Sequence, residues 1–380
     1  MSKDHTAYDA SHIVVLEWPE VVRRRPGMYI GSTGERGLHH LVFELAGWVL
    51  ERGLGGPVHP VEITLAADGC VRVAEHGTDR RSGTEEEAAL EDRLTRFHCG
   101  GAGAGRRLLL GPSFGTEPAV VNALSERLTA EVWRDGACRV LGYERGVAVA
   151  VPVARGAGER PGTVITFRPD GEVFETVEFS FEVLAGRFRE LAFLYRELDI
   201  TLTDERGSAA PRSLRFHFPG GPRDHIAGLG APVHPDVFGF ERECPEMEGT
   251  VEVALRWCEP GAEQVVSYAN SHPTTEGGAH ELGFREGLAA AVTAQARERL
   301  LLAPTDPGFT CAQLGAGLTA VVSVKLDRPW FEGATRGRLG NEPVRGCVAD
   351  AVREELTAWL RADGARATAI LGRIVAAARR

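Results

Sequence analysis

The stretch Gly37-Leu-His-His-Leu-Val-Phe-Glu-Leu-Ala-Gly-Trp48 decides the fold prediction for this chain. Apolar residues recur at helical spacing from residue 39 to residue 54, which predicts one long helix with a buried face. His40 and Glu44 stand four residues apart, so they share a face of that helix and can touch. Taken alone, such a pair is a common polar feature of a surface or a cavity edge, and it does not establish catalysis.

Strand and helix patterns are mixed in the segment that follows this helix. A glycine-rich, flexible connection is expected at 100–115. Helical patterns occur at 84–98, 118–128 and 181–197. Alternating patterns predict strands at 61–65, from 69 onward, and at 129–134, 138–143, 147–153, 163–168, 199–203 and 212–217.

Pro219-Gly-Gly-Pro222 predicts a domain boundary. Beyond it, 249–257 and 264–269 are expected to pair as strands, and 318–325 reads as a buried strand. Helices are predicted at 283–302, 341–361 and 365–379. The pattern is that of two α+β domains in tandem, divided into residues 1–220 and 221–380.

Composition narrows the range of functions. The formal net charge of −10 over 380 residues disfavours non-specific binding to a nucleic-acid backbone. No apolar run reaches the roughly 20 residues that span a bilayer, so no membrane partner is expected. The seven cysteines are scattered without a CxxC pair, which predicts no metal motif and reduced thiols in a cytoplasmic protein.

Several segments, in the same order and at nearly the same spacing, resemble DNA gyrase B and the other ATPase subunits of type IIA topoisomerases. The resemblance implies a Bergerat-type (GHKL) ATPase α/β sandwich with an N-terminal dimerisation arm over residues 1–220. It implies a transducer domain of ribosomal-protein-S5-like fold over residues 221–380. The segments that carry it are residues 8–17, 21–31, 37–44, 120–125, 276–284 and 318–325.

The resemblance implies ATP and Mg²⁺ as cofactors and a DNA-topoisomerase context. It also implies a homodimer, or a heterodimer with a gyrase B subunit. DNA contact is weakly supported because the chain is acidic. The chain stops where the family's transducer ends, so we expect no toprim domain and no DNA strand cleavage by this chain alone.

The family pattern assigns a role to individual residues of this sequence. Glu44 matches the general base that activates water, and His40 matches the histidine that supports it. Tyr8 matches the arm residue that reaches the partner's site, and Arg336 stands where a lysine contacts the γ-phosphate. Glu75 stands where the family has an aspartate that accepts a hydrogen bond from adenine, and it could still accept that bond from a longer side chain. The remaining matches are Thr163 for adenine, Gly77 two residues after Glu75, and Gly111 and Gly115 in the phosphate lid.

Three residues depart from the family pattern at positions that alter the pocket. Trp48 stands where an asparagine oxygen ligates Mg²⁺, and an indole offers a hard cation no oxygen. Asp79 replaces a glycine near the adenine. Glu117 replaces a glycine at the lid, where a carboxylate repels a triphosphate. These changes predict impaired ATP binding and hydrolysis, although Trp48 could instead be ordinary core.

Two other functions stay open. The chain could be a non-catalytic paralogue, a pseudoenzyme that binds a gyrase subunit or a gyrase-directed inhibitor. Alternatively, a remodelled pocket could perform acid–base chemistry on a small molecule. The residues expected in that pocket are His40, Glu44, Trp48, Glu75, His76 and Glu117. The basic run 23–25 is interpreted as a solvated turn rather than a nucleic-acid site.

Overall fold

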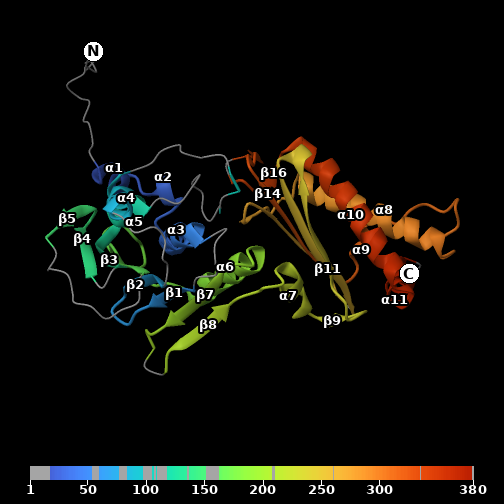
Figure 1. Cartoon of the computed structure of the whole chain (residues 1–380), viewed down its shortest axis with the longest axis horizontal. Coiled ribbons are helices and arrows are strands. Elements are labelled where there is room, and N and C mark those ends of the chain that lie inside the picture. Colours follow the sequence, from blue (N-terminus) through green and yellow to red (C-terminus); the bar gives the residue numbers. More distant parts are fainter. Residues whose placement is uncertain are drawn as a thin grey trace, which may run out of the picture.

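The chain forms two bodies, each built on a β-sheet that is covered by helices (Figure 1). The fold is that of a computed structural model. Its described residues are 18–53, 60–76, 84–96, 105–106, 108, 118–134, 137–150, 162–207, 210–259, 261–333 and 335–378.

The first body contains an eight-stranded sheet in the order β5-β4-β3-β6-β2-β1-β7-β8. Neighbouring strands run antiparallel except β1 and β7, which are parallel. The strands are β1 (Pro60–Leu65), β2 (Val71–His76), β3 (Ser125–Arg134), β4 (Ala137–Glu144), β5 (Val147–Val149), β6 (Gly162–Pro169), β7 (Asp199–Asp204) and β8 (Arg212–Phe216).

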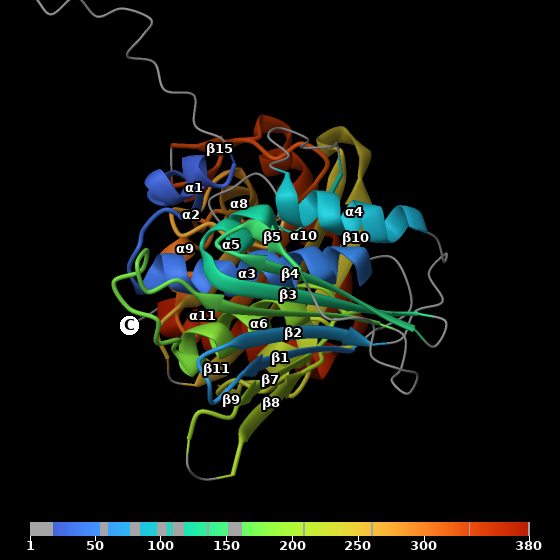
Figure 2. The same cartoon turned by 90° about the vertical axis from the view of Figure 1, so that its left-hand side faces the viewer.

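Helices pack on one face of this sheet and supply most of its core. α3 contacts β1 and β2, α5 contacts β3, and α6 contacts β7 and β8. In Figure 2 the strands follow one another down the view from β4 through β3, β2, β1 and β7 to β8. The helices are α1 (Glu20–Arg24), α2 (Gly27–Ile30), α3 (Glu35–Gly53), α4 (Thr84–Thr95), α5 (Pro118–Ala123) and α6 (Phe181–Leu194).

The helix predicted at 118–128 is too long. α5 ends at Ala123 and β3 already begins at Ser125, so the last residues of the predicted helix are strand. Every residue of α5 is buried, which removes the polar face that would have marked a helix boundary. The strand predicted at 147–153 is described only as β5, Val147–Val149.

The second body contains a sheet in the order β10-β11-β14-β12-β13, with β9 paired to β11. β14 is the central strand and eight of its nine residues are buried, as the sequence predicts. The strands are β9 (Ala231–Pro232), β10 (Phe238–Cys244), β11 (Gly249–Glu259), β12 (Gln264–Ala269), β13 (His272–Pro273) and β14 (Leu318–Leu326).

The prediction that 249–257 pairs with 264–269 is wrong, because β14 lies between β11 and β12. β14 pairs antiparallel with β11 and parallel with β12. A parallel neighbour requires a crossover, and the chain makes it through α8. The apolar β14 thereby takes the middle of the sheet, where both of its faces are buried.

Helices α8 (Ala279–Glu298) and α10 (Glu342–Ala362) pack against each other, and their backbones approach each other closely at two glycines of α8. Gly283 and Gly287 make this possible. A Cβ on Gly283 would lie 2.3 Å from the carbonyl oxygen of Arg345, and one on Gly287 would lie 2.5 Å from that of Ala349. The remaining elements are α7 (Pro222–Ala227), η2 (Pro245–Met247), α9 (Cys311–Gly315), β15 (Phe331–Glu332), β16 (Arg338–Leu339) and α11 (Gly364–Ala378).

The two bodies share packed and ionic contacts. The ring of Phe193 in α6 stacks on His225 in α7, with centroids 4.2 Å apart, and meets Tyr268 of β12 edge-on. Arg196 pairs with Glu252 of β11. The division predicted at residues 220/221 falls between β8 and α7; it stays a prediction.

The basic run 23–25 is only partly a solvated turn. Arg24 and Arg25 are exposed, as expected. Arg23, however, donates hydrogen bonds to the Asp170 carboxylate at 2.6 Å and to the Ala123 carbonyl oxygen at 2.9 Å. It therefore holds α1 against the ends of β6 and α5.

Two further expectations concern membranes and thiols. In the part of the chain that the structure describes, no helix combines the length and the apolar character needed to cross a bilayer. The six cysteines within that part carry free thiols.

We expect the substitution Gly287→Ala to lower the free energy of unfolding by roughly 1–3 kcal/mol, because a methyl group would force α8 away from α10. Gly346→Ala is the matched control. Gly346 lies within α10, and a Cβ there would meet no atom within 4 Å, so the better helix propensity of alanine should stabilise by up to about 1 kcal/mol. Urea unfolding measures both. Equal stabilisation by the two substitutions would contradict the close helix contact.

We expect buried histidines to make the protein less stable in mild acid. His280 is fully buried, and burial lowers its pKa to about 3. The unfolded chain binds a proton near pH 6.5 that the folded chain does not, so stability falls as the pH decreases from about 6.5, by about 1.4 kcal/mol per pH unit. His280→Gln should flatten this dependence between pH 6.5 and pH 4 in urea titrations. An unchanged slope would show that His280 does not contribute.

Candidate functional site

Helix α3 carries the first half of the candidate site. Leu38, Leu41 and Leu45 are fully buried and fix the helix on the sheet. His40 and Glu44 are nearly as buried, with 4% and 2% of their surface exposed. Two ionisable side chains at such low exposure require a partner. The pair is therefore not a surface feature of the helix.

His40 and Glu44 are partners for each other. Nε2 of His40 lies 2.7 Å from Oε1 of Glu44, as their spacing predicts. The angles at Nε2 do not fit a hydrogen bond, and this nitrogen has no aligned partner among the described residues. A carboxylate held beside an imidazole in this way can accept a proton from water.

The neighbouring His39 has a different environment. Its Nε2 accepts the N–H of Ser180 at 2.7 Å, and its ring meets Phe179 edge-on. Burial lowers the pKa of His39, which favours the neutral ring that this hydrogen bond requires. Ser180 is the N-cap of α6, so His39 joins α3 to α6 and has a structural role.

Strands β2 and β6 place two of the predicted adenine residues together. Glu75 and Thr163 lie directly opposite each other in the antiparallel register, and each is only 4% exposed. They share the face of Val73 and Ile165, which belong to the core beneath the helices. Gly162 permits this close pairing, since a Cβ there would lie 2.2 Å from the carbonyl oxygen of Glu75.

His76 does not join this group. It follows Glu75 in β2, so its side chain leaves the opposite face of the sheet. There its Nε2 lies 3.8 Å from the Glu62 carboxylate, and both side chains are partly exposed. The hypothesis of a remodelled acid–base pocket that includes His76 is wrong for this residue.

Trp48 lies one turn beyond Glu44 on α3. It is half-buried and packs against the core of the first body. Residues four apart on a helix are neighbours, so the indole lies beside the turn that presents Glu44. Gly47, which precedes it, is buried and has no side chain to offer a ligand.

Arg336 lies in the second body between β15 and β16. It is 7% exposed, its backbone is left-handed with φ +54°, and burial lowers its pKa. The next residue, Gly337, lies against Glu276, because a Cβ on Gly337 would be 2.8 Å from the Glu276 carboxylate. Because Arg336 is buried, its guanidinium group has few orientations open to it.

Three basic residues near Arg336 escaped the sequence analysis. The pKa of His272 is lowered to about 4, first by burial and then by the positive charges of Arg187, Arg336 and Arg36. Arg187 donates a hydrogen bond to the Ser271 carbonyl oxygen at 2.9 Å. These residues come from α3, α6 and β13, so only the fold brings them together, and no sequence motif could have revealed them.

The other predicted site residues lie outside the described residues, and their roles stay predictions. They are Tyr8, Gly77, Asp79, Gly111, Gly115 and Glu117.

Comparisons with known proteins identify the family. A family model described as DNA gyrase B matches residues 224–380. The novobiocin-resistant DNA gyrase B protein of Streptomyces niveus is 41% identical over 393 residues, which cover 98% of this chain. The chain spans 58% of the length of that relative.

Solved structures cover nearly the whole chain. The 43K ATPase domain of Thermus thermophilus gyrase B, in complex with an aminocoumarin, superposes with a TM-score of 0.78 at 30% identity and 94% coverage of both chains. The B-subunit of the Myxococcus xanthus DNA gyrase gives a TM-score of 0.76 at 26% identity, covering 93% of this chain and 99% of that one.

The predicted fold class is thereby confirmed. It is a Bergerat-type (GHKL) ATPase α/β sandwich followed by a transducer domain of ribosomal-protein-S5-like fold. The chain belongs to the DNA gyrase B family, of which it represents the N-terminal ATPase-like module.

Proposed function

We propose that this module keeps the scaffold and the water-activating pair of its family but binds and hydrolyses Mg²⁺-ATP poorly. The buried His40–Glu44 contact at 2.7 Å, with Trp48 one turn further along α3, is the observation that carries the proposal. The first two residues retain the chemistry of a general base, and the third replaces an oxygen ligand with an indole.

The adenine side of a nucleotide fits the residues present. The Glu75 carboxylate can accept a hydrogen bond from an exocyclic amino group, and the Thr163 hydroxyl can donate or accept beside it. Both side chains are buried on the same face of the sheet. Buried polar groups of this kind require partners, which a nucleotide base can supply.

The residues at the expected metal position do not fit Mg²⁺. Mg²⁺ requires oxygen ligands in near-octahedral geometry, and the turn after Glu44 provides Gly47 and Trp48. Micromolar nucleotide affinity corresponds to about 8 kcal/mol. Each lost phosphate or metal contact costs roughly 1–3 kcal/mol, so two or three losses would bring the affinity towards millimolar.

Association with a second subunit is part of the proposal. A homodimer, or a heterodimer with a gyrase B subunit, would use the family's N-terminal arm with Tyr8. The second candidate function is a regulatory one, in which this module occupies such a heterodimer without turning over ATP. In the part of the chain that the structure describes, each body keeps an extensive hydrophobic core while Trp48 stands at the position of the metal ligand, which suits that function. Co-purification with a gyrase B subunit, measured as a 1:1 complex by light scattering, tests it.

We expect Trp48→Asn to restore nucleotide binding. Calorimetric titration with a non-hydrolysable ATP analogue should give no micromolar binding by the native chain. The variant should bind at least tenfold more tightly, and only with Mg²⁺, because the amide oxygen replaces the missing ligand. Trp330→Asn is the matched control, since Trp330 is 58% exposed and lies in the second body. Micromolar, Mg²⁺-dependent binding by the native chain would overturn the proposed impairment.

We expect Glu75 to hold the base of the nucleotide that the Trp48→Asn variant binds. Adding Glu75→Ala to that variant should weaken binding by tenfold or more, because a buried partner of the adenine edge is lost. Glu62→Ala is the control, since Glu62 lies on the neighbouring strand but on the opposite, exposed face. Equal affinities of the two double variants would show that Glu75 is not a nucleotide contact.

A further inference from the structure

We propose that His234, Asp236 and Asp363 form a binding site for a divalent transition-metal ion such as Zn²⁺. The site lies in the second body, is built from three residues supplied by two distant parts of the sequence, and does not depend on the nucleotide site. One ligand atom from each side chain lies within 4.8 Å of the other two.

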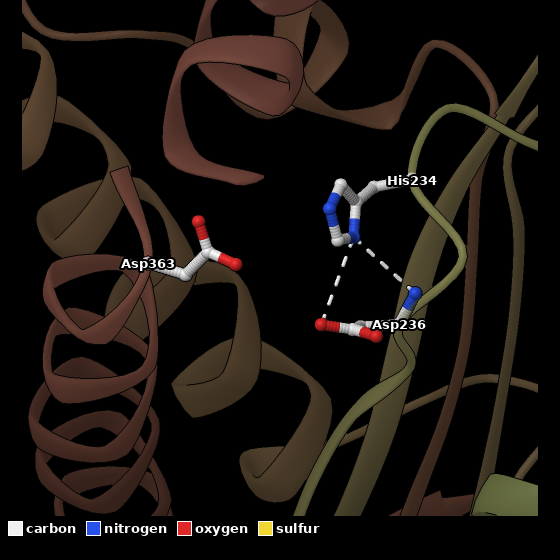
Figure 3. Close-up of side chains that lie close together, drawn as sticks. All are labelled: His234, Asp236 and Asp363. Carbon is white, nitrogen blue, oxygen red and sulfur yellow. Dashed lines mark hydrogen bonds and ion pairs between the residues drawn. The ribbon is translucent and has the colours of Figure 1, made fainter. Parts of the chain in front are cut away.

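Two separate parts of the fold supply these ligands. His234 and Asp236 lie in the connection between β9 and β10, and Asp363 lies at the junction where α10 ends and α11 begins. Figure 3 shows the Asp363 carboxylate approaching the His234 imidazole from the side opposite to the strand connection. An ion here would link the loop before β10 to the helix pair.

The Asp363 carboxylate is oriented by the start of α11. Its Oδ1 accepts the backbone N–H groups of Ala365 at 2.8 Å and Arg366 at 3.1 Å. These two hydrogen bonds fix the direction of the carboxylate. They also engage one oxygen and leave Oδ2 for an ion, which is the arrangement that outer-shell hydrogen bonds give to metal ligands.

His234 is poised beside Asp236. Its Nδ1 accepts the Asp236 N–H at 3.3 Å and lies 3.8 Å from Oδ2 of the Asp236 carboxylate. An ion bound at Nε2 requires the ring proton to lie on Nδ1. Nδ1 would then donate a hydrogen bond to the Asp236 carboxylate and would no longer accept the Asp236 N–H. A ligating histidine commonly donates its second N–H to a carboxylate in this way.

The ligand types identify the class of ion. One imidazole nitrogen with carboxylate oxygens suits Zn²⁺, Co²⁺ or Mn²⁺, whereas Mg²⁺ and Ca²⁺ prefer oxygen alone. Ligand atoms bonded at about 2.1 Å to one tetrahedral ion lie about 3.4 Å apart. The three ligand atoms lie within 4.8 Å of one another, so the side chains would have to close by up to about 1.4 Å.

Arg366 affects the affinity of the site for a metal ion. Its Nη1 lies 3.0 Å from Oδ2 of Asp236, and its guanidinium packs over the Trp359 ring at 4.0 Å. The two aspartates and the arginine together carry a formal charge of −1. Arg366 therefore weakens the attraction of the aspartates for a cation.

The test uses the full chain, with Co²⁺ as a spectroscopic probe and Zn²⁺ in calorimetry. Native protein should show ligand-field absorption with Co²⁺ and bind one Zn²⁺ at micromolar concentration. His234→Ala and Asp363→Asn should each weaken Zn²⁺ binding by tenfold or more. Asn still caps α11, so the second variant keeps its fold. His76→Ala is the matched control, because His76 also lies 3.8 Å from one carboxylate but has no third ligand among the described residues.

A third variant tests whether the ion binds specifically at the three proposed ligands. Arg366→Met keeps an apolar side chain against Trp359 and removes the opposing charge, so it should tighten Zn²⁺ binding several-fold. Unchanged affinity in both His234→Ala and Asp363→Asn, or equal loss in His76→Ala, would mean an adventitious ion only and would overturn the proposal. So would the absence of any Zn²⁺ binding by the native chain.

Discussion

The structure of the first body depends on burying an imidazole and a carboxylate together inside a helix–sheet layer. Neither His40 nor Glu44 could be tolerated there alone, because an isolated buried charge is costly. Their contact at 2.7 Å requires α3 to run continuously through that turn. The leucines on the same helix then anchor it to β1 and β2, which positions Glu75 and Thr163. The contacts that hold α3 on the sheet are therefore also the contacts that position the candidate site residues.

Much of this arrangement could be predicted from the sequence, because the long periodic segments carry strong signals. The helices α3, α6 and α10 and the apolar strand β14 were expected nearly where they lie. Strand neighbours were harder to predict. β11 and β12 look alike along the chain, and only the packing of the intervening crossover reveals that β14 separates them. Short buried segments such as α5 lack the polar face that defines a boundary.

The candidate site, too, could be predicted from the sequence only in part. The spacing of His40 and Glu44 on one helix is a local property, and the sequence predicts their contact correctly. The face on which His76 emerges depends on strand register, and the role of Arg23 depends on Asp170, far along the chain. The basic surroundings of Arg336 and the His234–Asp236–Asp363 group are likewise products of tertiary structure. Motifs cannot report such groupings, because their members are not all neighbours in sequence.

The glycine contact between α8 and α10 has a mechanical meaning. Where a carbonyl oxygen already fills the space that a Cβ would need, one helix cannot slide or roll over the other without steric collision. The two helices are therefore expected to move together, and with them β14 and β10, which α8 and α10 respectively contact. A displacement at one end of either helix would be transmitted to both helices and to that sheet.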